Sequence, residues 1–160
     1  MDRFRVWARV DNRLVHGQVI ETWLPYSNAR SIVVGNDELA QDPLQQEIIK
    51  LAVPQGVEIT FSTLAGILEQ VSRIYNYRYS KDIFLLFHSC EDAKAAFEAG
   101  VNFHALNIGN LHYAPGKRQI CDHIALSQDD MHCLRFFQDK GIRLDFRCVP
   151  NIQVQVKPIW

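Results

Sequence analysis

The chain has 160 residues, of which 48% are hydrophobic and 22% are charged, as in an ordinary globular domain. A chain of this length buries roughly 68–70% of its unfolded surface on folding, so it needs neither a disulfide nor a metal for stability. Its 17 Lys and Arg against 18 Asp and Glu give a formal net charge of -1. Without a basic excess to neutralise a phosphate backbone, the composition excludes nucleic acid as an expected partner.

The targeting signals that would place a chain outside the cytoplasm are not expected here. No apolar core of a secretory signal follows residues 1–5, and the strongly apolar run at residues 83–87 is far too short to span a bilayer. The four cysteines form no Cys-x-x-Cys pair and have no histidine at zinc-finger spacing. We therefore expect a cytoplasmic chain that does not itself span the membrane, has reduced thiols, and uses no metal or cofactor.

Strand and helix patterns begin at the N-terminal end. Apolar residues alternate with polar ones from residue 4 to 10, which predicts a strand with one apolar face. The other face carries arginines and a tryptophan, so either it is thinly covered or the arginine stems take part in the packing. Apolar residues then recur at helical spacing from 15 to 24, and Pro25 is expected to end that helix.

The alternation continues through the rest of the chain. A strand at residues 31–35 precedes a helix that begins well at Asp42-Pro43, with an N-capping Asp and Pro at the first helical position. Ser89 and Ser127 are expected to cap two later helices. Further strands are expected at residues 57–61, 82–87, 103–108 and 142–148, the last near a sheet edge, with a further helix at 64–74 and an apolar stretch at 120–126.

This order of elements predicts the fold class. Repeated strand–helix units with short connections favour an α/β fold with a mostly parallel sheet covered by helices. The chain has no linker, internal repeat or low-complexity block, so we expect a single domain over residues 1–160. In such folds, ligands bind beyond the carboxyl ends of the strands, near the start of the following helices.

The loop after the first strand has the composition of a reactive site. Residues 11–18 read Asp-Asn-Arg-Leu-Val-His-Gly-Gln. Arg13 and His16 are three residues apart and can face one point in a turn, while Gly17 lets a ligand approach the backbone. A helix N-terminus favours a neutral, nucleophilic imidazole and then stabilises an attached phosphoryl group, as Arg13 also would. Asp11 either holds the imidazole tautomer or anchors Arg13; the competing interpretation of His16 is a helix cap or a packed ring.

Residues 8–19 closely resemble the active-site segment of the mannose/sorbose-family IIB component of the sugar phosphotransferase system (PTS). That segment is an apolar strand followed by Asp-Asp-Arg-Leu-Ile-His-Gly-Gln-Val. Residues 35–38, 106–109, 115–118 and 126–147 are similar to later segments of the same family, so the resemblance extends from about residue 4 to 149. Two positions depart from it: Asn12 replaces the second acid of the usual pair, and Asn110 stands where a second Gly is usual, which predicts a less permissive loop.

The resemblance implies a three-layer α/β/α domain and a phosphoryl relay. His16 would accept a phosphoryl group at Nδ1 from the phosphohistidine of a IIA partner. It would then pass the group to a sugar bound by the IIC/IID membrane permease, the activity of a protein-phosphohistidine–sugar phosphotransferase. Arg13 and the loop backbone at Asn12, Leu14 and Gly17 would hold the phosphoryl group in flight.

Three more residues are candidates for the rim of the site. His88, Ser89 and Gly109 stand at or near the ends of strands on the same sheet edge, although a plain helix cap at Ser89 is the simpler interpretation.

Other functions remain open at this point. A regulatory module would keep the fold and the phospho-switch but signal to a partner protein without driving sugar transport. A hydrolase with His16 as general base would turn over esters without a donor protein. An arginine-bearing strand and a tryptophan at the end of the chain leave self-association open.

Overall fold

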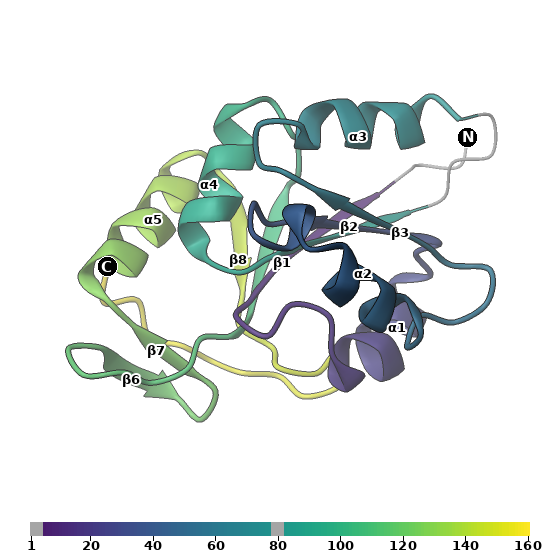
Figure 1. Cartoon of the computed structure of the whole chain (residues 1–160). Helices are drawn as coiled ribbons and strands as arrows, with labels where there is room; N and C mark the ends of the chain where they lie inside the picture. The colour runs from purple at the N-terminus through teal and green to yellow at the C-terminus, as the bar shows by residue number, and fades with distance from the viewer. Residues whose placement is uncertain (1–4, 78–81) are drawn as a thin grey trace.

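Six parallel strands form one sheet, with the first strand of the chain close to its centre (Figure 1). The structure is a computed structural model that describes residues 5–77 and 82–160. The strands of the sheet are β1 (Val6–Asp11), β2 (Ser31–Gly35), β3 (Glu58–Ser62), β4 (Ile83–Phe87), β5 (Ala105–Asn110) and β8 (Arg143–Asp145). Their order is β3-β2-β4-β1-β5-β8, so the sequence prediction of a mostly parallel sheet is confirmed.

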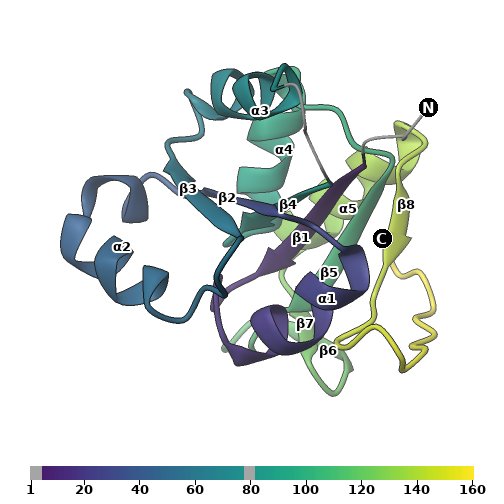
Figure 2. The ribbon, with the colours of Figure 1, turned by 90° about the vertical axis from the view of Figure 1, so that its right-hand side faces the viewer.

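Helices cover both faces of this sheet (Figure 2). One face packs against α3 (Ile67–Tyr75), α4 (Cys90–Glu98) and α5 (Gln128–Asp139). The other face packs against the π-helical turn η1 (Val19–Trp23) and α1 (Leu24–Ser27). The short 3₁₀ turn η2 (Leu39–Gln41) leads into α2 (Pro43–Lys50), which has no buried residue. The result is the three-layer α/β/α arrangement that the family resemblance implied.

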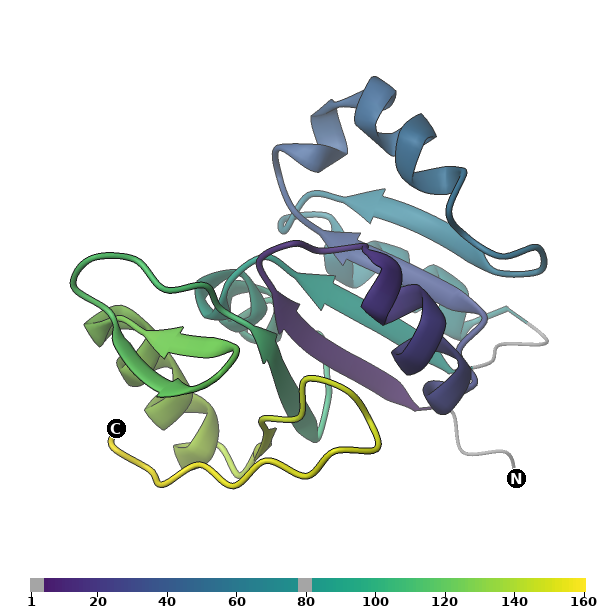
Figure 3. The ribbon, with the colours of Figure 1, turned by 90° about the horizontal axis from the view of Figure 1, so that it is seen from below.

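A small antiparallel hairpin interrupts the parallel pattern. It consists of β6 (Arg118–Cys121) and β7 (Ile124–Leu126), which replace the one apolar stretch expected at residues 120–126. Figure 3 shows the hairpin on the side of the molecule away from α2 and β3. In the described part of the chain, no helix is both long enough and apolar enough to cross a bilayer.

The helix starts follow the expected local signals. The Asp42 carboxylate accepts a hydrogen bond from Gln45 N at 3.1 Å, and the Ser89 hydroxyl accepts one from Asp92 N at 3.2 Å. Around Ser127 the capping is reciprocal, because its hydroxyl accepts from Asp130 N while the Asp130 carboxylate accepts from Ser127 N. These three predicted caps are confirmed.

The predicted end of the first helix at Pro25 is wrong, because the helix continues to Ser27. In η1, Leu24 N donates to Val19 O, five residues back, so the backbone is in a wider π turn just before the proline. Proline has no N–H to donate and its ring clashes with a carbonyl of a regular α turn. The π turn relieves that conflict, and Asn28 then ends the helix in the left-handed conformation.

The arginine-bearing face of β1 is buried at its carboxyl end, whereas Arg5, just before the strand, is exposed. Arg9 is fully buried, which selects the second of the two sequence interpretations, in which the arginine takes part in the packing. The terminal Trp160 is also packed within the chain. Its ring lies 5.6 Å from that of Phe146, and its Nε1 donates to Gln138 Oε1 at 3.0 Å.

Candidate functional site

An irregular pairing at the end of β1 directs Asp11 into the site. Val10 lies opposite Ile108 of β5, but Asp11 lies opposite Asn110, so the pairing skips Gly109. Such a bulge re-aims the side chains beside it and is common next to active sites. Here it brings the side chains of Asp11 and Asn110 together at the carboxyl edge of the sheet, with an Asn110 Nδ2 to Asp11 Oδ2 distance of 2.9 Å.

His16 stands at the start of the helix that follows the loop and faces Asp11. Its carbonyl accepts a hydrogen bond from Ile20 N at 3.1 Å, and its Nε2 lies 2.7 Å from Asp11 Oδ2. The His16 side chain is 14% exposed, whereas the Asp11 side chain is fully buried. The contact with Asp11 occupies Nε2, whereas Nδ1 is not part of that contact.

Asp11 is held as a carboxylate by the groups around it. Its Oδ2 accepts from Arg9 Nη2 at 3.0 Å, from Asn110 Nδ2 at 2.9 Å and from the His16 ring, and its Oδ1 accepts from Arg13 N at 3.0 Å. Burial alone would raise the pKa of Asp11. The hydrogen bonds from His16 and Asn110 and the charge of Arg9 outweigh burial and lower that pKa to about 2. Asp11 therefore presents a negative oxygen to the imidazole throughout the neutral pH range.

Arg9 is the buried cation beneath this carboxylate. Burial lowers the pKa of Arg9, and the ion pair with Asp11 opposes that shift. Its Nη1 also donates to Asn107 Oδ1 at 2.5 Å, and its guanidinium lies 5.1 Å from the centre of the Trp23 ring. The carbonyls of Arg147 and Cys148, from the segment after β8, accept further hydrogen bonds from the same guanidinium. Arg9 thus has the partners that a buried charge requires.

Gly109 lies underneath the site and not at its rim, where the sequence analysis had expected it. The residue is buried, and a Cβ at this position would lie only 2.0 Å from Arg9 Cζ. The absence of a side chain at Gly109 therefore makes room for the guanidinium. Its contribution to the site is made through Arg9 and Asp11.

The rest of the loop surrounds His16 with backbone and one exposed cation. The Arg13 side chain is 44% exposed, and its Nε lies 3.9 Å from Asp11 Oδ1. Leu14 has a φ of 55°, in the left-handed region that non-glycine residues rarely adopt. A Cβ on Gly17 would meet no atom within 4 Å apart from its chain neighbours, so a side chain there would meet no steric barrier. Asn12 Oδ1 is buried and has no hydrogen-bond partner among the described residues.

His88 and Ser89 follow β4, the neighbour of β1. Phe87, the last residue of β4, lies opposite Val10, so both loops leave the same edge of the sheet. His88 is exposed there, whereas the Ser89 hydroxyl caps α4. The simpler interpretation of Ser89 as a helix cap therefore describes its contacts.

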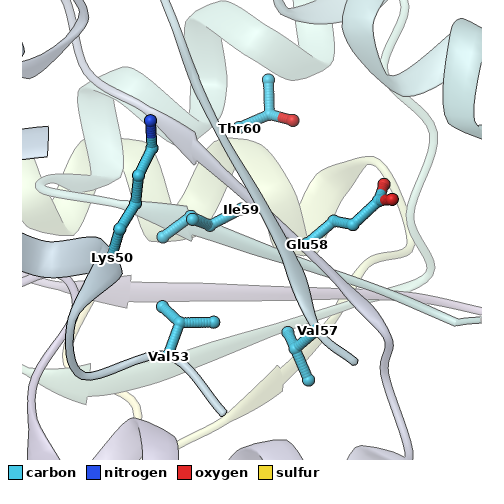
Figure 4. Close-up of a pocket in the computed structure, with 6 residues that line it drawn as sticks. All are labelled: Lys50, Val53, Val57, Glu58, Ile59 and Thr60. Carbon is cyan, nitrogen blue, oxygen red and sulfur yellow. The ribbon is translucent and has the colours of Figure 1, made fainter. Parts of the chain in front are cut away.

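A hollow of about 390 Å³ lies away from this site, between the end of α2 and the edge strand β3 (Figure 4). Strands β2 and β4 separate β3 from β1. The residues around the hollow are Lys50, Val53, Val57, Glu58, Ile59 and Thr60.

Across residues 5–77 and 82–160, no cluster of three His, Cys, Asp or Glu side chains is placed to hold a metal ion.

Several side chains that hold Asp11 and His16 were not predicted from the sequence. Arg9 carried a signal, because a charged residue in a central parallel strand requires an explanation. Asn110 was noticed only as a departure from the family pattern, whereas its side chain is part of the site. Gln18, whose Oε1 accepts from Arg9 Nη2 at 3.2 Å and from Asn110 Nδ2 at 3.1 Å, carried no signal of its own.

Comparisons with known proteins point to one family. The family model described as "PTS system sorbose subfamily IIB component" matches residues 5–157. The PTS system sorbose-specific EIIB component of Klebsiella pneumoniae is 32% identical over 145 residues, which cover 90% of this chain and 87% of that protein. The PTS system mannose-specific EIIAB component of Escherichia coli (strain K12) is 30% identical over 144 residues, which cover 89% of this chain and 43% of that protein. The structure of a PTS-dependent N-acetyl-galactosamine-IIB component from Streptococcus pyogenes matches with a TM-score of 0.88 at 26% identity. The match covers 99% of this chain and 98% of that one. The chain therefore belongs to the sorbose-subfamily IIB components of the sugar phosphotransferase system.

Proposed function

We propose that His16 accepts a phosphoryl group at Nδ1 from the phosphohistidine of a IIA protein and transfers it to a sugar bound by a IIC/IID membrane permease. The contact between His16 Nε2 and Asp11 Oδ2, at 2.7 Å, is the observation that carries this proposal. It leaves the other ring nitrogen to act as nucleophile. The name of the E. coli EIIAB relative, which contains both component letters, supports a IIA donor. In this role the chain works in the cytoplasm, at the surface of the permease.

In the first step, the Nδ1 lone pair attacks phosphorus while the P–N bond of the donor histidine breaks. The His16 ring gains positive character as the new bond forms, and the Asp11 carboxylate stabilises that charge through the Nε2 proton. Arg13 is exposed at the same loop and neutralises charge on the phosphoryl oxygens. The catalytic groups are thus His16 and Arg13, with Asp11 orienting the ring.

In the second step, a sugar hydroxyl oxygen forms the new P–O bond as the Nδ1–P bond breaks. The hydroxyl proton is released, and His16 returns to a neutral ring with its proton on Nε2. We infer that the donor and the acceptor approach the same side of the loop, where a Cβ on Gly17 would meet no atom within 4 Å. One imidazole can therefore serve two partners in turn.

The test is transfer of labelled phosphate from a phosphorylated IIA protein to this chain. We expect an acid-labile, base-stable label that is absent from His16→Ala, because N-linked phosphate hydrolyses in acid. His132→Ala, which alters an exposed histidine on α5, serves as the matched control and should take label like the wild type. Equal labelling of His16→Ala, in a variant whose melting curve shows it to be folded, would disprove the proposal.

A second arm separates transport from regulation. Phosphorylated protein is mixed with membranes that contain a IIC/IID permease and its sugar, and sugar phosphate is measured. Label that reaches His16 but never the sugar would favour a regulatory phospho-switch over the relay.

A further inference from the structure

The carboxamide of Asn110 connects the two ends of the loop that carries His16. Its Nδ2 donates to Asp11 Oδ2 at 2.9 Å and to Gln18 Oε1 at 3.1 Å. Asp11 is the last residue before the loop, and Gln18 lies two residues after His16. Asn110 O also accepts a hydrogen bond from Asn12 N at 3.1 Å. A single residue of β5 therefore contacts the loop on both sides of the reactive histidine.

Asn110 is buried, and its burial makes these hydrogen bonds costly to lose. Asn110 is only 5% exposed, so water cannot readily replace a lost hydrogen bond. The two acceptors are shared with Arg9, whose Nη2 donates to Asp11 Oδ2 at 3.0 Å and to Gln18 Oε1 at 3.2 Å. Asp11 Oδ2 and Gln18 Oε1 thus each accept hydrogen bonds from both Asn110 and Arg9. A carboxylate held in this way cannot rotate without breaking several hydrogen bonds.

We propose that Asn110 is a positioning residue for phosphoryl transfer, which fixes the Asp11 carboxylate and Gln18 so that His16 presents Nδ1 in one orientation. This inference rests on the proposed function of His16. Asn110 does not touch the transferred group; it acts through Asp11, whose Oδ2 lies 2.7 Å from His16 Nε2. The loss of its donor therefore reduces the rate of transfer, while docking of the IIA protein is unaffected because the side chain is buried.

The variants separate the hydrogen-bond donor from the shape of the side chain. Asn110→Ala removes both, whereas Asn110→Leu keeps a branched side chain of similar shape without the donor. We expect each to lower kcat for transfer from phosphorylated IIA by about tenfold and to leave KM within about twofold, as expected for one misdirected contact. Asn102→Ala, an exposed asparagine just before β5, is the matched control and should retain wild-type kcat and KM.

Two further measurements report on positioning directly. In the wild type, the His16 Nε2 proton should give a downfield ¹H NMR signal that is protected from exchange, and Asn110→Ala should lose it. Gln18→Ala should lower kcat by a similar factor. The double variant Asn110→Ala/Gln18→Ala should be about as slow as the slower single variant, because both act on one element.

The outcomes decide between the inference and the function on which it rests. A wild-type protein that takes no label refutes the proposed function, and the NMR signal then still tests whether Asn110 positions His16. If the wild type is labelled, three results each overturn the inference: Asn110→Ala transfers at the wild-type rate, Asn110→Leu does so, or KM rises while kcat is unchanged. If a variant at 110 does not fold, wild-type kinetics in Gln18→Ala overturns it.

Discussion

At Asp11, a single oxygen atom connects the buried cation of Arg9 with the ring of His16. Oδ2 accepts from Arg9, Asn110 and His16, while Oδ1 accepts from Arg13 N. The carboxylate therefore both stabilises Arg9 and orients the imidazole. Arg13 differs from Arg9, because its side chain is 44% exposed and its pairing distance with Asp11 is 3.9 Å. Such an exposed pair contributes little to stability, so the proposed role of Arg13 in phosphoryl transfer does not conflict with a structural one.

The Arg13→Ala variant tests this division of roles. We expect the rate of phosphoryl transfer to fall by about 10–100-fold, because a cation that stabilises the transition-state charge is lost, while the melting temperature stays within about 2 °C. Stopped-flow label transfer and a thermal melt measure the two quantities. Arg73→Ala, at an exposed arginine on α3, is the control. A large drop in melting temperature without a change in rate would contradict the assignment.

At the level of helices, strands and loops, local sequence signals and tertiary packing determined different features. The caps at Ser89 and Ser127 were predictable because each depends on residues within one turn. The continuation of the first helix past Pro25 was not, because the π turn that allows it is set by packing of Val19 and Trp23 against the sheet. The skipped pairing at Gly109 likewise depends on a neighbouring strand that is distant in sequence.

The capping box of α5 provides a stability prediction. Ser127→Ala should lower the free energy of unfolding by about 1 kcal/mol, because one N–H at the start of the helix loses its partner. Urea unfolding followed by circular dichroism measures the change. Ser72→Ala, at an exposed position inside α3, should have an effect below about 0.5 kcal/mol. Equal effects at the two serines would show that the cap has no special role.

For the whole molecule, the sequence predicted the sheet and the edge strand, and it singled out the loop of the candidate site, but it did not predict the residues that lie beneath that loop. The apolar periodicity of each strand is local, so the parallel sheet could be inferred from one sequence. The contacts of Arg9 come from Asn107, Arg147 and Cys148, which lie far along the chain. No pattern around residue 9 could identify these partners, because the strand order brings them together.

Acid stability tests the buried ion pair in the context of the whole fold. At pH 7, Asp11→Asn should lower the free energy of unfolding by about 3–5 kcal/mol, because Arg9 loses its counter-ion. The pKa of Asp11 falls from 3.8 to about 2 on folding. The shift itself contributes roughly 2 kcal/mol of stability, which is fully present above about pH 4 and is lost as the pH falls through about 2.

The measurement is urea unfolding of the wild type and Asp11→Asn at several pH values from 7 to 2. The difference in the free energy of unfolding between the two proteins should shrink as the pH approaches 2. Asp139→Asn, at an exposed carboxylate of α5, is the control and should show no such convergence. A constant difference from pH 7 to pH 2 would mean that Asp11 does not stabilise the fold through its charge.

The place of Gly109 beneath Arg9 has a consequence for how this chain can diverge. A methyl group at residue 109 would occupy the volume of the guanidinium, at 2.0 Å from Cζ. Homologues with a larger residue at the position of Gly109 should therefore also have replaced the arginine at the position of Arg9, and the acid at the position of Asp11 would then lack its counter-charge. The dependence runs one way, because Arg9 can be replaced while Gly109 stays, whereas a side chain at residue 109 leaves no room for Arg9.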